Sequence, residues 1–179
     1  MLNFIKRNSF QLKANQKATG NMHILYNYAP KEIDVLKTGL WAPVCAPRTL
    51  LAHYFGRART RTKKGVLAYL ESTCPGRSRA ISFLTSPMTG ECLYYADFCQ
   101  DRILYSINFD RLIQDGLVEA IYRSEGKKLI KIMPQDIQWD EVLPWKNVKK
   151  GLFFKAIPHY MVVMRDGKIP PEYITHVKN

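Results

Sequence analysis

Acidic residues are scarce in this sequence, and over one long stretch they are absent. The chain has 27 Lys and Arg against 15 Asp and Glu in 179 residues, a net charge of +12. From Val35 to Leu70 there is no carboxylate, while seven side chains are basic: Lys37, Arg48, Arg57, Arg59, Arg61, Lys63 and Lys64. This excess predicts a nucleic acid or another polyanion as partner. The alternative is that the charge only keeps the protein in solution.

Metal-site and membrane patterns are also missing. The four cysteines, Cys45, Cys74, Cys92 and Cys99, form no CxxC pair and have no histidine at zinc-finger spacing, so no metal site is expected. No run approaches the ~20 apolar residues that span a bilayer, and the N-terminus lacks a compact apolar signal region. We therefore expect a cytoplasmic protein, with an organellar targeting segment over the acid-free N-terminus as the alternative.

The common catalytic signatures are absent as well. The sequence contains no GxSxG, GxxxxGK[ST], HExxH or GxGxxG. This excludes serine hydrolases, P-loop enzymes, zinc proteases and dinucleotide-binding folds that depend on those motifs. The four histidines are far apart in sequence, and an isolated histidine is more often structural than catalytic.

The residues that are present predict one globular domain over 1–179, with 1–21 as a basic N-terminal arm. The chain is 46% hydrophobic and 12% aromatic, which is enough to form one core at this length. Short helices are expected mainly in the N-terminal half, and the strands that dominate later do not alternate regularly with helices. The fold class predicted is α+β with a mainly antiparallel sheet.

The individual elements follow from local patterns. Aromatic and β-branched runs bounded by turn residues predict strands, and Lys128 to Met133 pairs with the run before it as a hairpin. Pro30 is expected in the first turn of a helix whose inward face carries Ile33 and Leu36 and whose C-terminal cap is Gly39. The other helices are expected at Thr49 to Ala58, Lys64 to Thr73, Glu91 to Cys99 and Phe109 to Gln114. The strands are expected at Met22 to Tyr28, Ala80 to Thr85, Arg102 to Asn108, Leu117 to Tyr122, Lys128 to Met133, Leu152 to Ala156 and Tyr160 to Met164, followed by a closing segment, Ile169 to Val177.

Arginines alternate with small residues in the middle of the acid-free stretch. In an extended conformation they project to one side, which suits a phosphate backbone. We predict nucleic-acid contacts from Arg48, Arg57, Arg59, Arg61, Lys63 and Lys64. His53, Tyr54 and Phe55 could stack on exposed bases. The alternative is a helix with an aromatic core face and a solvated basic tail.

The segment GRSRAISFLTS, Gly76 to Ser86, combines arginines with hydroxyl groups at the end of an expected strand. Arginine can bind a phosphate there, and serine or threonine can bind a ribose hydroxyl. The alternative is that Thr85, Ser86 and Pro87 only form a turn.

Three segments resemble the ADP-ribosyltransferase-like fold: LYNYAPKEIDVLKTGL at Leu25 to Leu40, SRAISFLTSPMTGECLYYADF at Ser78 to Phe98, and RILYSINFDRLI at Arg102 to Ile113. Together they cover about half of the chain. The resemblance is to the DNA-targeting toxins and the RNA 2′-phosphotransferases of that family, and it implies a split antiparallel sheet. It also implies NAD as cofactor and a nucleic acid or protein as substrate.

The resemblance assigns roles to particular residues. The expected cofactor-binding set is Tyr26, Asn27, Tyr28, Arg79, Ser82, Thr85 and Ser86. Asn27 stands where the family usually has His or Arg, and its tyrosine neighbours could stack on a ring. The late strand that often carries a catalytic glutamate corresponds to Lys155 to Val163, which has no acid, so the expected catalytic residues are His159, Tyr160 and Glu172 as a substitute carboxylate. The alternative function is a non-catalytic nucleic-acid-binding or protein-interaction module.

Overall fold

A computed structural model describes residues 22–55, 76–93, 95–126, 128–148 and 157–178. Within them, nine strands form three antiparallel sheets with the orders β1-β4-β9, β2-β8 and β3-β7-β5-β6. The strands are β1 Ile24–Pro30, β2 Leu40–Trp41, β3 Ala80–Phe83, β4 Arg102–Asn108, β5 Val118–Glu125, β6 Lys128–Ile132, β7 His159–Met164, β8 Lys168–Ile169 and β9 Ile174–His176. The α-helices are α1 Val35–Thr38, α2 Arg48–Phe55, α4 Tyr95–Cys99 and α5 Phe109–Gln114, and the 3-10 turns are η2 Arg77–Arg79, η3 Pro134–Asp136, η4 Trp145–Asn147 and η5 Pro171–Tyr173. The predicted α+β class with a mostly antiparallel sheet is confirmed.

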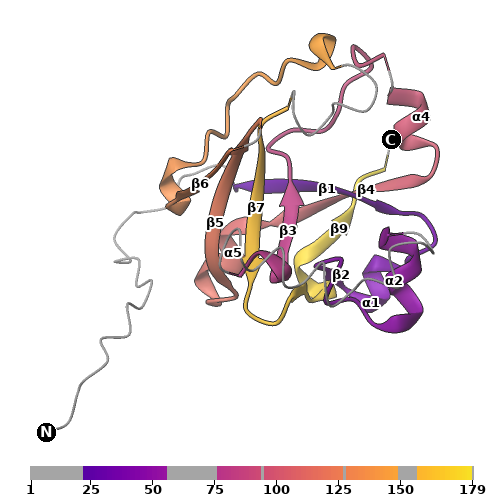
Figure 1. Cartoon of the computed structure of the whole chain (residues 1–179), viewed down its shortest axis with the longest axis vertical. Helices are drawn as coiled ribbons and strands as arrows, with labels where there is room; N and C mark the ends of the chain where they lie inside the picture. Colours follow the sequence, from indigo (N-terminus) through magenta and orange to yellow (C-terminus); the bar gives the residue numbers. More distant parts are fainter. Residues whose placement is uncertain (1–21, 56–75, 94, 127, 149–156, 179) are drawn as a thin grey trace, which may run out of the picture.

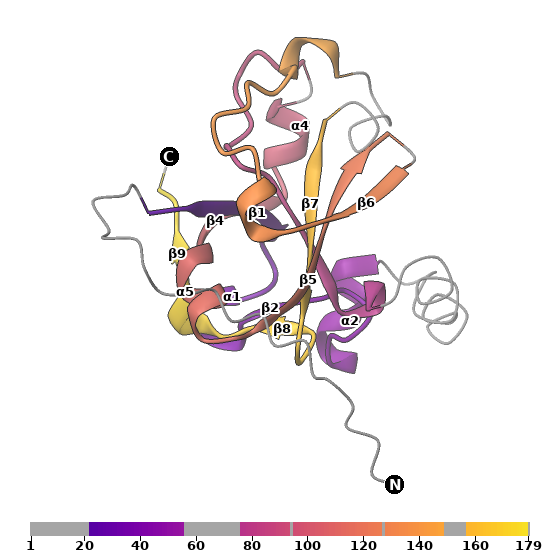
Figure 2. The ribbon, with the colours of Figure 1, turned by 90° about the vertical axis from the view of Figure 1, so that its left-hand side faces the viewer.

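The two larger sheets run in different directions and enclose the core between them (Figures 1 and 2). In one sheet β4 is the central strand, with Tyr26 opposite Ser106 and Ile107 opposite Ile174. In the other sheet β7 and β5 are central, and Phe83 lies opposite Tyr160. Because side chains alternate along a strand, each strand of the second sheet presents one set of residues to the core and the other set to the opposite face.

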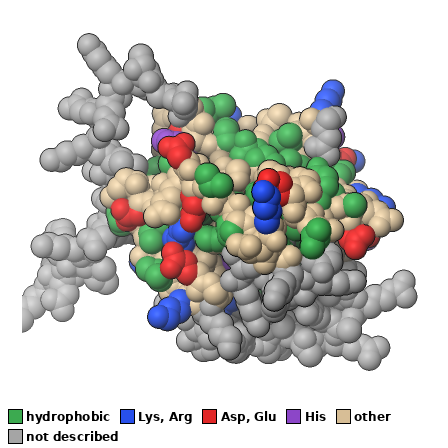
Figure 3. Space-filling view, turned by 90° about the horizontal axis from the view of Figure 1, so that it is seen from above, with side chains coloured by type: hydrophobic (Ala, Val, Ile, Leu, Met, Phe, Trp, Pro, Cys, Tyr) green, Lys and Arg blue, Asp and Glu red, His purple; other side chains and the backbone are tan. Residues whose placement is uncertain are grey.

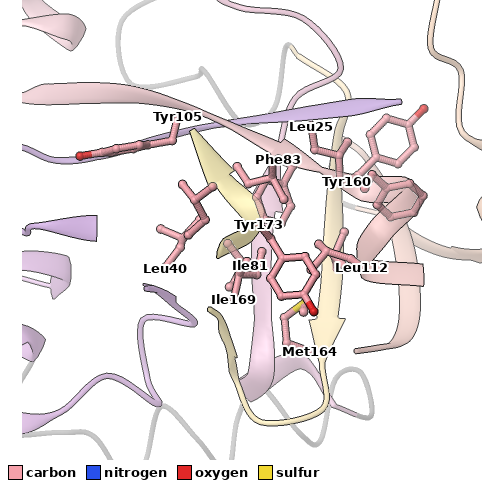
Figure 4. Close-up of a cluster of buried hydrophobic side chains, with 14 of the residues drawn as sticks. Leu25, Leu40, Ile81, Phe83, Tyr105, Leu112, Tyr160, Met164, Ile169 and Tyr173 are labelled. Carbon is pink, nitrogen blue, oxygen red and sulfur yellow. The ribbon is translucent and has the colours of Figure 1, made fainter. Parts of the chain in front are cut away.

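The main core is built from apolar side chains of both large sheets (Figure 4). Leu25 and Ile107 come from one sheet, and Ile81, Tyr160 and Met164 come from the other, all of them 4% exposed or less. The burial of these side chains is the largest favourable contribution to folding. The strand alternation in the core therefore fixes which residues of β3 and β7 face away from it.

A smaller apolar cluster lies beside α4, where the chain segments around η4 also pack (Figure 2). Its buried members include Leu84, Met88, Leu143 and Trp145, and Tyr28 packs against it from β1. Met88 N–H also donates a hydrogen bond to the Tyr28 hydroxyl oxygen over 2.9 Å. This cluster holds the loop after β3 against the face of β1.

The region around α1 differs in part from the sequence prediction. Gly39 ends the helix with φ 79°, as predicted, but Pro30 is the last residue of β1 rather than part of a helix, and Asp34 caps α1. Ile33 is buried, whereas Leu36 is 47% exposed and Val35 takes the inward position. The helix has only four residues, too few for the expected spacing of inward positions to apply.

Most other predicted elements are present with shifted ends. The helix expected at Thr49 to Ala58 is α2, and the one expected at Glu91 to Cys99 is the shorter α4. The closing segment forms β8, η5 and β9. The basic arm 1–21, the helix Lys64 to Thr73 and the strand Leu152 to Ala156 lie outside the described residues. Among the described helices, none has the length and apolar character needed to cross a membrane.

Candidate functional site

Strands β1 and β3 belong to different sheets and are joined at one bridge. Tyr26 and Leu84 exchange two backbone hydrogen bonds of 2.8 and 3.0 Å. Next to this bridge, Asn27 Nδ2 donates to the Ser82 carbonyl oxygen over 2.8 Å. The residues that follow Tyr26 on β1 and those that precede Leu84 on β3 line the two sides of a groove.

The groove consists of two adjoining hollows of different size. The small hollow has a volume of about 80 Å³ and is lined by Tyr26, Asn27, Tyr28, Ser82, Phe83, Leu84, Phe98, Arg102 and His159. The large hollow has a volume of about 420 Å³ and is lined by Asn27, Tyr28, Ala29, Pro30, Leu40, Trp41, Pro43, Val44, Tyr54, Arg77, Ser78, Ala80, Ile81, Ser82, Arg102 and Met161. Four residues, Asn27, Tyr28, Ser82 and Arg102, line both. The size of the large hollow is typical of small-molecule sites.

The charge of the groove is positive. Arg77 and Arg102 line it, and none of the described residues along its walls is Asp or Glu. Positive side chains without neighbouring carboxylates attract anions, and arginine in particular suits phosphate. The electrostatics of the groove therefore favour a phosphate-bearing ligand.

Arg102 lies at the junction of the two hollows. Its guanidinium stacks over the Phe98 ring, with 4.8 Å from Cζ to the ring centroid, and Nη1 donates to the Tyr28 carbonyl oxygen over 3.3 Å. Its Nε and Nη2 have no hydrogen-bond partner within the described part of the chain. The side chain is thus positioned by its neighbours and keeps donors for a ligand.

His159 is the first residue of β7 and is buried beside the small hollow. Its Nδ1 lies 3.3 Å from the Ile157 carbonyl oxygen, and since a carbonyl can only accept, Nδ1 carries the proton. Burial lowers the pKa of His159 below its ordinary value, and the nearby charge of Arg77 lowers it further. The neutral ring then has its lone pair on Nε2, which makes this atom a hydrogen-bond or proton acceptor.

Aromatic side chains form much of the remaining wall. Tyr28 and Phe98 meet edge to face with their ring centroids 5.3 Å apart, and burial raises the pKa of Tyr28 to about 12. In the large hollow, Trp41 N–H donates to the Tyr54 hydroxyl oxygen over 3.2 Å, and burial raises the pKa of Tyr54. Aromatic faces of this kind are suited to stacking on a base or a nicotinamide ring.

The groove brings together part of the predicted site. Of the expected cofactor-binding residues it contains Tyr26, Asn27, Tyr28 and Ser82, and of the expected catalytic residues it contains His159. These residues come from β1, β3 and β7, which are far apart in the sequence. The fold thus brings these five residues to one hollow, and the roles expected of them stay predictions.

Three other expected cofactor-binding residues do not line either hollow. Arg79 Nη1 forms a 2.6 Å ion pair with Glu119 Oε2 and also donates to the Arg165 carbonyl oxygen. Thr85 is buried, and its hydroxyl has no partner among the described residues. Ser86 follows it, outside the groove. Past the bridge at Leu84 the chain leaves the groove wall, which explains the position of the last two.

Tyr160 and Glu172 also lie away from the groove. Tyr160 alternates with His159 on β7, so its side chain enters the core, where it is 1% exposed. Glu172 is exposed on η5, where its backbone carbonyl accepts from Arg111 Nη1 over 3.2 Å. Neither side chain reaches the groove. A one-residue step along a strand reverses the face, so Tyr160 points away from the groove that His159 lines. Glu172 lies elsewhere because η5 packs near α1.

The Tyr160 hydroxyl belongs to a partly buried charge cluster on the core side of β7. It accepts hydrogen bonds from Arg123 Nη1 and from Gln138 N–H. Arg123 also binds Glu125 Oε1 at 2.6 Å and Glu141 Oε1 at 2.7 Å. We call Arg123, Tyr160, Glu125 and Glu141 the arginine clamp. It ties β5, β7 and the loop after β6 together.

Several groove residues have no signature in the sequence. Arg77 precedes the expected Arg79 by two positions, and only the left-handed Gly76, with φ 78°, and the turn η2 decide which of the two faces the groove. Arg102 starts a strand, and Trp41 sits in a two-residue strand. Tyr54 was expected to stack on bases and does line the large hollow. The sequence offered one weak signal for Arg102: it is the first residue of an expected strand that follows an expected helix.

The net charge of the protein lies outside the described residues. Ranges 1–21, 56–75, 127 and 149–156 hold 13 of the 27 Lys and Arg and one of the 15 Asp and Glu, which leaves 14 of each sign in the described part. Figure 3 shows basic and acidic side chains interspersed on one face. Arg48, at the start of α2, is described and exposed, while Arg57, Arg59, Arg61, Lys63 and Lys64 lie outside the described residues.

Comparison with known proteins adds no relative. No protein-family model, no curated protein and no solved structure matches the chain. The properties of the groove itself are therefore the basis for a function.

Proposed function

We propose that the groove binds a nicotinamide dinucleotide and that the protein transfers ADP-ribose from it to a nucleic acid or a protein. The observation that carries the proposal is a groove at the meeting point of two antiparallel sheets, lined by six aromatic side chains and two arginines and by no described carboxylate. A dinucleotide offers flat rings for the first feature and a pyrophosphate for the second. The transfer chemistry comes from the resemblance of three chain segments to the ADP-ribosyltransferase-like fold.

The residues of the groove fit such a ligand in their chemistry. Nicotinamide dinucleotide supplies an ADP-ribose unit joined to nicotinamide by a labile glycosidic bond. Tyr26, Tyr28 and Phe98 line the small hollow, and Trp41 and Tyr54 line the large hollow, so aromatic side chains are present in both for packing against the rings of the ligand. His159 is the only histidine among the described residues that line the groove, which makes it the candidate general base for a ribose hydroxyl or an attacking group.

The macromolecular substrate is best accounted for as a nucleic acid. The described chain ends at Phe55 and continues at Gly76, and the neighbouring residues Tyr54 and Arg77 both line the large hollow. In the sequence, the stretch between these two groove residues contains five basic residues, Arg57, Arg59, Arg61, Lys63 and Lys64. Clustered positive charge of this kind attracts a polyanionic substrate.

The second candidate is a binding module without catalysis. Transferases of the resembling family often use a glutamate at the ribose, but no described carboxylate lines the groove, and Glu172 is exposed on η5. Removing a group that stabilises a developing positive charge commonly costs several kcal/mol of transition-state stabilisation. This observation favours a protein that holds the nucleotide and the nucleic acid without joining them.

Calorimetry and mass spectrometry separate the two candidates. The full chain is titrated with nicotinamide dinucleotide and then incubated with it and single-stranded DNA, RNA or bulk protein. Heat of binding together with a product heavier by one ADP-ribose supports the transferase, while heat without a product supports the binding module. Absence of heat at millimolar dinucleotide contradicts both the cofactor and the proposed activity.

The nucleic-acid partner is tested through salt dependence. Replacing Arg57, Arg59 and Arg61 with Ala should reduce the slope of log K against log salt for single-stranded DNA by about two. The control replaces three exposed lysines of the described part, Lys128, Lys131 and Lys178, and should leave most of the slope in place. Equal losses in both variants would mean that the arginines have no special role.

A further inference from the structure

The Asn27 side chain connects β1 to β3 in the middle of the groove. The end of β3 is directed at β1 (Figure 1), and within the described part of these strands they pair only at the bridge between Tyr26 and Leu84. Asn27 is the next residue on β1, and its Nδ2 donates to the Ser82 carbonyl oxygen over 2.8 Å. Both residues line the small and the large hollow. The amide therefore lies where the two hollows adjoin.

The hydrogen bond to Ser82 fixes the direction of the Asn27 amide. A backbone carbonyl oxygen can only accept, so Nδ2 and not Oδ1 must face it. Oδ1 has no donor in the described part of the chain, and one hydrogen of Nδ2 is also left for a ligand. The hydroxyls of Ser82 and Tyr26 can each donate or accept, so they impose no such direction. Asn27 thus presents an acceptor and a donor side by side in a fixed order.

We infer that Asn27 determines ligand specificity by pairing with a planar edge that carries an amino group beside an acceptor atom. The inference rests on the proposed binding of nicotinamide dinucleotide, which has two such edges: the carboxamide of the nicotinamide and the amino edge of the adenine. The amino group of the ligand donates to Oδ1, and the remaining hydrogen of Nδ2 is donated to the neighbouring oxygen or ring nitrogen. Asparagine pairs with adenine in this two-point manner.

The surroundings of Asn27 make this pairing selective. Asn27 is half-buried, and aromatic side chains line both hollows beside it, so a ring that enters loses much of its water. An acceptor that loses water without gaining a donor costs free energy, and a site built to bind a donor therefore rejects an analogue that lacks it. Arg102, at the same junction, attracts the phosphates of any dinucleotide and cannot distinguish one base from another.

Calorimetry of the full chain with three dinucleotides tests the inference. Nicotinamide dinucleotide is compared with its acetylpyridine analogue, in which a methyl group replaces the carboxamide amino group, and with its hypoxanthine analogue, in which an oxygen replaces the adenine amino group. Both analogues keep the charge of the natural compound, so the arginines do not distinguish them. We expect one of the two to bind about tenfold more weakly, and its identity tells which end of the ligand Asn27 contacts.

The variant Asn27→Ala identifies the residue responsible. It should bind the natural dinucleotide about tenfold more weakly and the sensitive analogue within about twofold of the natural compound, because the discriminating group is gone. If the amide only held the two strands together, all three ligands would be weakened alike and the ratio would persist. The matched control is Asn147→Ala, an exposed position on η4 outside both hollows, which should leave the affinities and their ratio unchanged. Thermal unfolding shows whether each variant is folded.

The outcomes separate this inference from the proposed function. Equal binding of all three dinucleotides by the natural chain overturns the inference, leaves the proposed function standing and requires no variant. Discrimination that persists in Asn27→Ala has the same meaning, because another group must then be responsible. Absence of binding by any of the three contradicts the proposed function itself and the inference with it.

Discussion

Two groups of arginine side chains, one in the arginine clamp and one along the groove, have different surroundings. Arg123 of the arginine clamp is bound by Glu125, Glu141 and the Tyr160 hydroxyl. Arg77 and Arg102 line the groove. The same residue type thus has carboxylate partners in the clamp, whereas no described residue that lines the groove is a carboxylate.

The difference bears on how each charge would respond to an added anion. The hydrogen bonds from Arg123 to Glu141 and Glu125 keep the pKa of Arg123 above its ordinary value, so this charge is already compensated. A buried arginine with two carboxylates gains nothing from an added anion. In the groove, an anion would instead meet two positive charges that no described carboxylate of its walls neutralises.

The largest expected effect comes from breaking the arginine clamp. Arg123→Met should lower the free energy of unfolding by about 3 kcal/mol, because Glu141 and the Tyr160 hydroxyl lose their partner in a buried position. Chemical denaturation measures this change. The added substitution Glu141→Gln should restore part of the stability, because it removes the unpaired charge. An equally stable Arg123→Met variant would contradict the structural role of the clamp.

Removing a groove arginine should affect binding more than folding. Arg102→Ala should weaken dinucleotide binding about tenfold or more, since a charge-assisted hydrogen bond contributes about 1.5–3 kcal/mol. Calorimetry gives the affinity and thermal unfolding gives the stability, which should change little at this exposed position. The matched control is Arg79→Ala, because Arg79 is paired with Glu119 outside the groove. If both variants lose affinity equally, the groove is not the binding site.

Tyr160→Phe separates a structural tyrosine from a catalytic one. The hydroxyl accepts from Arg123 and from Gln138 N–H, so its removal should cost about 1–2 kcal/mol of stability. Nucleotide binding should stay within about twofold, because the side chain faces the core. A variant that binds the dinucleotide normally but has lost all transfer activity would return Tyr160 to the catalytic residues.

The smallest expected effect is on the pH dependence of stability without ligand. Burial lowers the pKa of His159 in the folded protein below 6.5, the ordinary value expected in the unfolded chain. At a pH between the folded and the unfolded pKa, the unfolded chain therefore binds more protons than the folded protein. Stability should therefore fall as the pH decreases through this window, and His159→Gln should remove that part of the decrease. His53→Gln, at an exposed position, serves as the control. Denaturation curves at several pH values measure the effect, and identical curves for natural and His159→Gln proteins would contradict it.

Much of the fold could be predicted because its signals are local. Alternation of apolar residues predicted the strands around Tyr105 and Tyr122, and Gly39 and Gly116 mark two turns with positive φ. Leu36 was misplaced because α1 is too short for a helical period to decide its inward face. Short elements take their orientation from the surfaces that they contact, which a local pattern does not contain.

The candidate site was predicted only in part, because local patterns do not contain the tertiary contacts that bring its side chains together. Tyr26, Ser82 and His159 were expected together from the resemblance, and the structure places all three on the small hollow. Arg77 lines the groove and the expected Arg79 does not, since Gly76 and the turn η2 control the direction of these side chains. Arg102 entered the site through strand pairing with β1, which joins residues more than 70 positions apart.

The sequence by itself determined the α+β class, the strand-rich second half and the position of the excess positive charge, because composition and periodicity act within short segments. It also determined that the stretch from Val35 to Leu70 has seven basic side chains and no carboxylate. The tertiary structure decided that Tyr54 and Arg77, which lie on either side of 56–75 in the sequence, line the same hollow. It also decided that His159 faces a cationic groove while Tyr160 faces the core, because only the pairing of β7 between β3 and β5 assigns a direction to each face.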